Sequence, residues 1–343
     1  MNALSLVLLM QLLSTSVTQQ KTFQAFLTDL LPQLDKALAN AGKSVSERPM
    51  EAARFIVDEV IVDIKGDTKD NYMEKPWFAL IFLSVQNWFK KRYGIAQVHP
   101  KRDAHGVVKH FGALYLLRIP LTLSKPQGDG TCWLTFAKDV LSEEDATGWI
   151  LNGPSLDGLH PKQVVTLRRE ATKTATQIRG IANDLMTADV ADDADRAMAA
   201  SVLRHLDKAA SDICAPSHES SSLAVWDLHM ACEKVMKAYL TQERVAYPMT
   251  HDLRKLNRLA PAKHDWSAVK LTLGNFPSEA RVMQWRYQEI VAPSVEELWR
   301  FYGVALQVCS TYASRMSRKW TFNNFSVHLK KPPWLGGDTL TGD

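Results

Sequence analysis

Long hydrophobic segments, closely spaced cysteines and a strong net charge are all lacking in this chain of 343 residues. No segment reaches the ~20 uninterrupted apolar residues that a membrane-spanning helix needs, so we expect no membrane association. The four cysteines, at positions 132, 214, 232 and 309, are too scattered for a zinc or redox motif. We expect them to be free thiols in a reducing cytoplasm. The net charge of +4 is too small to indicate a nucleic-acid partner by itself.

Several catalytic motifs are lacking as well. The sequence contains no Gly-x-x-x-x-Gly-Lys-Ser/Thr loop, no dinucleotide-binding fingerprint, no His-Glu-x-x-His and no nucleophile elbow. These absences exclude the enzyme classes that depend on those motifs. We predict that the protein uses no cofactor and binds no metal.

The chain has the length of two domains or of one large domain, and the composition of a globular protein, with 46% hydrophobic and 23% charged residues. Its first apolar run, Ala3 to Leu13, has no basic residue before it and fits a cleavage site poorly. A secretory signal normally has basic residues before the apolar run and a small-residue cleavage site after it. We therefore predict a first helix that packs on the protein and a cytoplasmic location, with a signal segment as the alternative.

The N-terminal third carries helical patterns. Apolar spacing predicts helices over about residues 21–41 and 77–93, and Gly94 is a stop signal for the second. Residues 52–64 fit a helix and a strand equally well.

A change of pattern follows. The β-rich runs 111–123 and 131–136 are joined by Ser-Lys-Pro-Gln-Gly-Asp-Gly, which predicts an antiparallel hairpin with a long turn. A polar segment with several Gly and Pro residues then extends over 143–161. We assign residues 1–160 to an N-terminal α+β module of unknown type.

Helical patterns dominate the remainder. They predict one helix over 192–213, two helices that meet at a turn within 223–259, and a last helix over 294–316. Four helices with short connections indicate an antiparallel bundle, which we assign to residues 161–320. Residues 321–343 are predicted to be a flexible tail. The predicted fold class is mainly α with a small β hairpin or sheet.

The helical hairpin within 223–259 is the most informative segment. One face of its first helix carries Ala224, Leu228, Ala231, Val235 and Ala238. Pro248 ends the helical register. Thr250 is placed to cap the next helix, and Asp252 lies in its first turn, where a negative charge is favourable.

The first helix of this hairpin contains Ala-x-Glu-Lys-x-x-Lys-Ala at 231–238, and a proline turn leads to Thr-His-Asp-Leu at 250–253. This combination resembles the HEPN family, and so does Arg286 next to Tyr287 ahead of the last helix. The resemblance covers about 192–316. It implies a four-helix bundle that usually dimerises. Many family members are metal-independent ribonucleases of toxin–antitoxin, abortive-infection or other defence systems.

Glu233 and Lys237 lie four residues apart within that segment, with the acid first. This order is favourable on a helix surface and contributes about 0.2–0.5 kcal/mol. We predict a solvated pair.

The resemblance also identifies candidate catalytic residues. Active HEPN proteins share an Arg-x4-6-His motif in which the arginine holds the phosphate and the histidine helps the RNA 2′-hydroxyl to attack. Within the segment that the resemblance covers, two pairs fit this spacing, Arg244 with His251 and Arg258 with His264. The first straddles the turn between two helices and the second crosses Pro261, whereas the family motif lies near the start of a late helix. Their placement favours a binding protein over a ribonuclease.

His251 has two interpretations. As a structural residue it hydrogen-bonds the backbone or Asp252 and fixes the turn, which is the interpretation we prefer. As a functional residue it contacts a phosphate together with Arg254 and the N–H groups at the helix start. Asp252, Lys237 and Arg286 complete the ligand-binding residues predicted for the bundle.

A second candidate nucleic-acid site lies between Trp88 and His110, where cations and aromatic rings alternate. Phosphates would bind the cations and bases would stack on the rings. Lys90, Lys91 and Arg92 are its predicted binding residues. The alternative is a basic helix end followed by a solvated loop.

A third motif, Asp63-Ile64-Lys65, matches the last half of a metal-dependent nuclease signature. That chemistry needs a strand that presents another carboxylate, such as Glu51, Asp58 or Glu59, to share a magnesium ion. We treat this motif as the weakest of the three.

The combined prediction is a HEPN-like interaction and dimerisation protein that associates with nucleic acid or a nucleotide in a defence or toxin–antitoxin system. The alternative is a metal-independent endoribonuclease that uses an Arg/His pair. The expected partners are a second copy of the chain, RNA or a nucleotide, and a separate nucleotidyltransferase or antitoxin.

Overall fold

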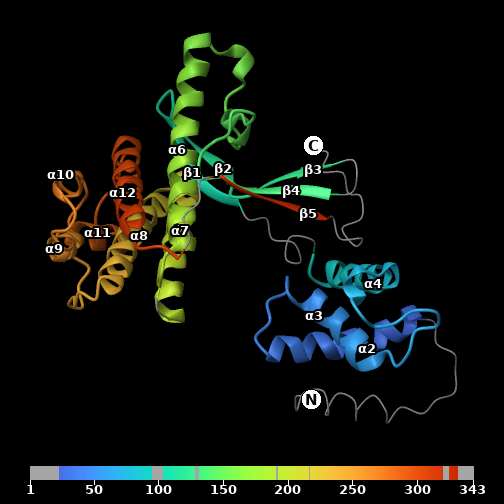
Figure 1. Cartoon of the computed structure of the whole chain (residues 1–343). Coiled ribbons are helices and arrows are strands. Elements are labelled where there is room, and N and C mark those ends of the chain that lie inside the picture. The colour runs from blue at the N-terminus through green and yellow to red at the C-terminus, as the bar shows by residue number, and fades with distance from the viewer. Residues whose placement is uncertain are drawn as a thin grey trace. The chain divides into compact units, whose positions relative to one another are not determined.

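The computed structural model describes residues 23–94, 103–127, 131–190, 192–215, 217–319 and 324–330. These residues form mainly helices together with two small antiparallel sheets, which confirms the predicted fold class (Figure 1). Contacts divide the chain into two compact units. The first consists mainly of residues 1–101 and the second of residues 102–127 and 132–329. The helix predicted at the start of the chain lies outside the described residues.

The described part of the first unit is helical. Its elements are α2 (Phe23–Asn40), α3 (Arg48–Phe55), the π-helical turn η1 (Ile56–Val60), the 3₁₀ turn η2 (Tyr72–Glu74) and α4 (Pro76–Tyr93). The helices α2 and α4 confirm two predicted helices, and Gly94 ends α4 with a φ of +81°. The ambiguous stretch is helical up to Val60, because Ala52, Ala53, Ile56 and Val57 form one fully buried helical face.

Four long helices organise the second unit: α6 (Pro161–Thr187), α7 (Asp193–Ile213), α8 (His218–Gln242) and α12 (Val295–Arg315). Helix α8 packs on both α7 and α12, and α12 also packs on α6. Three short helices connect α8 to α12, namely α9 (Leu253–Leu259), α10 (Ser267–Gly274) and α11 (Glu279–Arg286). No helix in the described ranges is long and apolar enough to cross a membrane.

The helices predicted at 192–213 and 294–316 and the helical hairpin are confirmed, but the membership of the predicted four-helix bundle is different. The fourth long helix is α6, and α9 is only 7 residues long. Helix α6 begins with Pro161, a favourable first residue, after a capping box formed by His160 and Gln163.

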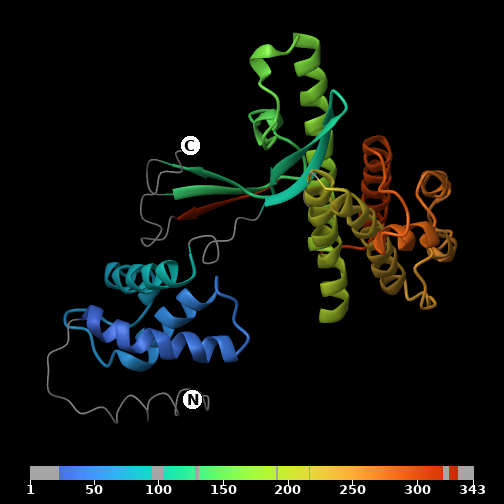
Figure 2. The same cartoon turned by 180° about the vertical axis from the view of Figure 1, so that it is seen from behind.

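The strands form two sheets. In the first, β1 (Asp103–His110) pairs antiparallel with β2 (Ala113–Pro120). In the second, the order is β3 (Leu123–Pro126), β4 (Thr131–Phe136) and β5 (Phe325–Lys330). Two views show β3, β4 and β5 extending away from the long helices (Figure 1, Figure 2).

These pairings confirm the predicted hairpin only in part. The run 111–123 is not one strand, because most of it pairs with β1 and only its last residue begins β3. Strand β1 escaped prediction, since its Lys and His residues suggested a basic loop. Strand β5 also lies in the segment predicted to be a flexible tail.

The division into units also differs from the boundary predicted at residue 160. Strand β1 packs on α6 and α7, and β2 packs on α6. Val107, Val108, Leu117 and Ile119 belong to the same buried cluster as the helices. The hairpin is therefore part of the helical core, and the second unit begins near residue 102.

Gly106 allows β1 to approach the helices closely. A Cβ at this position would lie 2.7 Å from Thr174 Cγ2, 3.1 Å from Ile119 Cδ1 and 3.3 Å from the Tyr302 hydroxyl. We predict that Gly106→Ala lowers the free energy of unfolding by about 1–3 kcal/mol, because these buried groups must move. Chemical denaturation measures the difference. Gly148→Ala is the matched control, since nothing lies within 4 Å of a Cβ there. Equal stability of the two variants would contradict the packing.

The imidazole of His105 links β1 to α7. Asp207 Oδ1 accepts from the His105 backbone N–H and lies 2.7 Å from its Nδ1. The hydrogen bond to Asp207 is the main cause that raises the His105 pKa above its ordinary 6.5, and burial partly opposes it.

This shift predicts a pH-dependent contribution to stability. A raised pKa means that the contribution is complete below pH 6.5 and disappears as the pH rises through the folded-state value. The stability difference between the native protein and His105→Gln should therefore be larger at about pH 6 than at about pH 8.5, by about 0.5–1 kcal/mol for this partly exposed pair. Urea unfolding at both pH values tests this, and a difference that grows with pH would be opposite to the prediction.

Candidate functional site: the Glu233 cluster

Glu233 lies in the middle of α8 with its carboxylate buried. Oε1 accepts from Lys237 Nζ at 2.7 Å, and Oε2 lies 2.8 Å from His251 Nδ1. The side chains of Glu233 and Lys237 are only 4% and 15% exposed, so the prediction of a solvated pair is wrong. The physical reason is that the segment after α8 folds back over this face, which also brings the ring of Tyr247 to 5.8 Å from Lys237 Nζ.

His251 is held on both sides. Its Nδ1 faces the Glu233 carboxylate, and its backbone carbonyl accepts from His229 Nε2 at 2.7 Å. The His251 side chain is 49% exposed. With Nδ1–H donating to the carboxylate, the neutral ring carries its lone pair on Nε2. The preferred structural interpretation is thus only partly right, because the side-chain partner is Glu233 and not Asp252.

His229 forms the buried base of the cluster. It is 1% exposed, and burial lowers the pKa of its imidazole below 6.5. The neutral ring donates from Nε2 to the His251 carbonyl, which makes Nδ1 an acceptor. Among the described residues this Nδ1 has no hydrogen-bond partner. Burial disfavours protonation of His229, and the hydrogen bond to His251 and the Glu233 carboxylate only partly oppose this, so the balance favours the neutral imidazole.

Trp226 and Arg286 extend the cluster to the surface. The Trp226 ring is almost parallel to that of His229, with 6.3 Å between centroids, and its centroid is 6.2 Å from that of His251. The exposed Arg286, in the last turn of α11, places Cζ 3.9 Å from the Trp226 centroid. This is a cation–π contact.

We define the Glu233 cluster as Trp226, His229, Glu233, Lys237, His251 and Arg286. The structure thus brings together three of the sequence-predicted residues, Lys237, His251 and Arg286. Sequence reasoning missed Trp226, His229 and the central role of Glu233. Their spacing by three and four residues along α8 was the available signal, since it places them on one helix face.

Asp252 and Arg254 have structural contacts. Asp252 is the N-cap of α9 and accepts from the N–H groups of Arg254 and Lys255. The predicted cap, Thr250, instead accepts from the Asp252 N–H at 3.2 Å. An aspartate oxygen reaches two N–H groups here, so it is the better cap.

Arg254 also faces inward. Its Nη2 donates to the backbone carbonyls of Leu273 at 2.8 Å and Phe276 at 2.7 Å. These bonds tie α9 to the end of α10. The phosphate contact predicted for Arg254 would compete with them.

The two spaced Arg/His pairs are not joined by a hydrogen bond or ion pair in the part of the chain that the structure describes. Arg244 is exposed in the turn after α8, with a φ of +57°, and Arg258 is exposed on α9. His264 lies against aromatic rings, 6.4 Å from that of Tyr239 and 5.9 Å from that of Trp266. The arginine that shares an aromatic neighbour with His251 is therefore Arg286.

The aromatic–basic block near Trp88 does not form one continuous element. Lys90, Lys91 and Arg92 end α4 in the first unit, whereas β1 belongs to the second, and residues 95–102 lie outside the described ranges. Arg92 lies over the Trp88 ring at 5.1 Å and its Nε is 3.1 Å from the buried carboxylate of Asp35. Arg92 therefore helps to hold its unit together.

The basic residues of β1 are either paired or buried. Lys109 pairs with Glu296 and His105 with Asp207, while His110 is buried. These contacts explain why a block that looks basic in the sequence includes a regular strand.

The Asp63-Ile64-Lys65 motif lies outside any strand, in the loop after η1. Within the described ranges no group of three or more His, Cys, Asp or Glu side chains could hold a metal ion. The strand that a metal-dependent nuclease requires is therefore missing at this motif.

The fold and this site together define a mainly helical protein in which a buried carboxylate orients a half-exposed histidine beside a stacked Trp–Arg pair. No protein-family model matches the chain, and searches of curated proteins and of solved structures give no match.

Proposed function

We propose that the protein is a HEPN-like interaction and dimerisation protein of a defence or toxin–antitoxin system, and that the Glu233 cluster binds RNA or a nucleotide. The observation that carries the proposal is the contact of exposed Arg286 with Trp226, next to a His251 ring fixed by Glu233. The Arg286 guanidinium can donate to phosphate oxygens, the His251 Nε2 lone pair can accept from a ribose hydroxyl, and fixed rings reduce the entropy lost on binding. The proposed protein partners are a second copy of the chain and a nucleotidyltransferase or antitoxin.

A binding experiment with two variants of α11 tests this site. We expect Arg286→Gln to weaken the binding of fluorescently labelled single-stranded RNA about tenfold, the loss of one charge-assisted contact of about 1.4 kcal/mol. Arg281→Gln is the matched control, because Arg281 is 55% exposed on the same helix and contacts Trp285 and Glu297 instead. Fluorescence anisotropy gives the dissociation constants of both variants. An equal loss of RNA affinity in the two variants would count against a specific site.

A metal-independent ribonuclease is the second candidate function. It is favoured by the Glu233–His251 pair, because a carboxylate that fixes Nδ1–H leaves Nε2 placed to accept a proton from a 2′-hydroxyl. Arg286 would then hold the phosphate in place of Arg244.

Cleavage of total RNA in the presence of EDTA separates the two functions. The ribonuclease proposal predicts that His251→Gln abolishes cleavage and that His205→Gln does not. His205 is a suitable control because Asp227 holds its Nδ1 at 2.7 Å in the same unit. Intact RNA with the native protein supports the binding function. Loss of cleavage in His264→Gln alone would assign the activity to Arg258 and His264 instead.

A further inference from the structure

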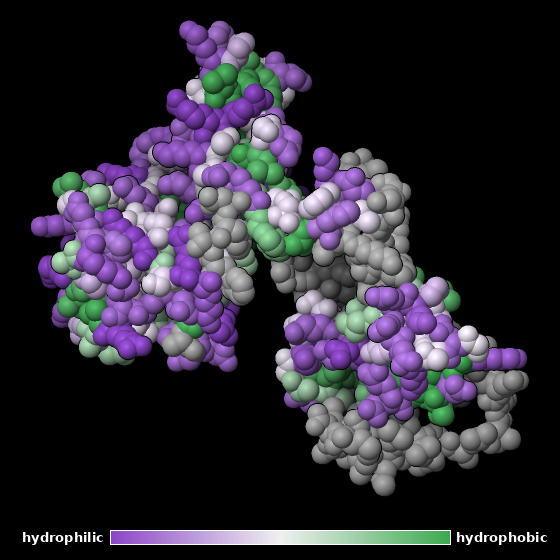
Figure 3. Space-filling view, viewed as in Figure 1, coloured by the Kyte–Doolittle hydropathy of each residue, from purple (hydrophilic) through white to green (hydrophobic). Residues whose placement is uncertain are grey.

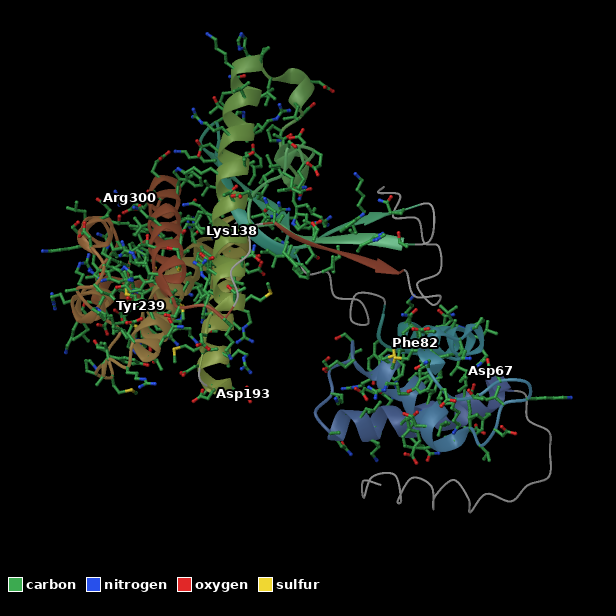
Figure 4. All side chains as sticks on the ribbon, in the orientation of Figure 1. Asp67, Phe82, Lys138, Asp193, Tyr239 and Arg300 are labelled. Carbon is green, nitrogen blue, oxygen red and sulfur yellow. The ribbon has the colours of Figure 1, made fainter. Side chains whose placement is uncertain are left out.

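A cavity of about 730 Å³ lies within the second unit, between the second half of α6 and the first half of α7 and against the end of β4. Typical small-molecule sites measure about 300–1,000 Å³. Figure 4 labels two residues beside this region: Lys138, which directly follows Ala137 of the cavity wall, and Asp193 at the start of α7. The cavity shares no residue with the Glu233 cluster.

Most of the cavity wall is apolar. Leu185 and Met186 of α6, Ala200 and Leu203 of α7 and Phe136 of β4 all line the cavity. Met186 is 60% exposed although it is large and hydrophobic. The view in Figure 3 shows hydrophobic side chains only in small groups on a largely hydrophilic surface. The apolar lining of the cavity differs from that surface. Aliphatic walls with one aromatic ring suit an alkyl chain better than a stacked base.

The charge along the cavity comes from α7. Arg196, Ala200 and Arg204 follow one another by four residues, so they lie on one helix face, and all three line the cavity. Arg196 pairs with Asp193. Arg204 is exposed and forms no ion pair within the described ranges.

Other charged groups near the wall are neutralised. Arg179 pairs with Glu144. Asp184, the neighbour of Asn183 in the wall, pairs with Lys138 and Arg318. The net charge that the cavity offers a ligand is therefore positive and lies at Arg204.

We infer that this cavity binds a fatty acid, that is, an unbranched alkyl chain with one carboxylate. The chain lies between α6 and α7, where burial of each CH₂ group contributes to affinity. The carboxylate lies at Arg204, because a guanidinium forms two parallel hydrogen bonds with a carboxylate. This site is separate from the proposed RNA site and does not depend on it.

Isothermal titration calorimetry with the full-length protein tests the inference, with decanoate, octanoate and 1-decanol as probes. We expect decanoate to bind about 15-fold more tightly than octanoate, which is about fourfold for each of two CH₂ groups. We expect 1-decanol to bind about tenfold more weakly than decanoate, because it cannot pair with a guanidinium.

Three variants locate the ligand. Arg204→Gln should weaken decanoate about tenfold and leave 1-decanol unchanged. Arg300→Gln, on α12, should leave decanoate binding unchanged (Figure 4). Ala200→Phe should abolish the binding of both probes, because the larger side chain fills the cavity. If circular dichroism shows that Ala200→Phe does not fold correctly, Ala182→Leu is used in its place, since it is a smaller change in the same wall. The inference is overturned if decanoate does not bind, if 1-decanol binds equally well, or if the cavity-filling variant binds normally.

Discussion

Replacing Arg179 by alanine lowers the free energy of unfolding by about 3–5 kcal/mol, the largest effect that we expect for any single side chain. The side chain is fully buried in α6. Nη1 and Nη2 donate to the two Glu144 oxygens at 2.7 and 2.8 Å, and Nε donates to the Pro120 carbonyl at 2.9 Å. Nη1 also donates to the Asp139 carbonyl, and Cζ lies 4.9 Å from the Trp149 ring centroid.

The loss of stability in Arg179→Ala comes mainly from the polar groups that lose Arg179 as their partner. Glu144 is 8% exposed and would be left as a buried charge without its partner. Two carbonyls would also lose their donor. Arg179→Lys should have an intermediate effect, because an ammonium keeps the charge and loses the planar arrangement of donors.

Urea denaturation of the Arg179→Ala variant measures the effect. Arg168→Ala is the matched control on the same helix, since Arg168 and Asp145 are 56% and 54% exposed and their N–O distance is 3.5 Å. The control should change stability by less than about 0.5 kcal/mol. If the two variants are equally stable, Arg179 does not anchor the segment that leads from β4 to α6.

The second large effect is expected at Glu233. Glu233→Ala should lower the free energy of unfolding by about 2–4 kcal/mol, because Lys237 would remain mostly buried without its counterion. The same substitution frees the His251 ring. We therefore expect a loss of both stability and RNA binding.

Two further variants isolate the electrostatic cause. Glu296→Ala removes the 71% exposed partner of Lys109 and should cost less than about 1 kcal/mol. The double variant Glu233→Gln with Lys237→Met removes both charges and should recover most of the stability, because no buried charge remains. A double variant as unstable as Glu233→Ala would contradict the assigned cause.

The sequence predicted those features that depend on local pattern. The apolar stripes of α2, α4, α7, α8 and α12 are spaced at helical intervals, and each of these helices is observed. Gly94 was identified as a stop for the same reason, since its backbone angle suits glycine.

Features that depend on tertiary contacts were not predictable. An acid–base pair four residues apart has the same pattern in solvent and in a core, so the burial of Glu233 followed only from the fold-back of the segment that carries His251. Arg179 gave no signal because its partners come from distant segments. The sequence of strand β1 was misleading, because it looks like a basic loop. His105 and Lys109 are in fact paired with Asp207 of α7 and Glu296 of α12.

The binding site was predicted residue by residue with mixed results. Lys237, His251 and Arg286 lie in one cluster, but Lys237 is mostly buried against Glu233, and Arg92 and Arg254 are engaged in contacts that hold the fold together. These residues differ in whether protein partners compete with a ligand for the side chain. A side chain with protein partners must give them up to bind a ligand, and Arg286 over Trp226 keeps its outer donors accessible.

The chemical shift of the His251 ring during an RNA titration is the most direct measurement of the central proposal. In a ¹³C-resolved NMR spectrum of the histidine rings, we expect the His251 signal to move in proportion to bound single-stranded RNA. The signal of His264, which lies against Tyr239 and Trp266, should stay in place. An unchanged His251 signal at saturating RNA would contradict the assignment of the Glu233 cluster as the ligand site.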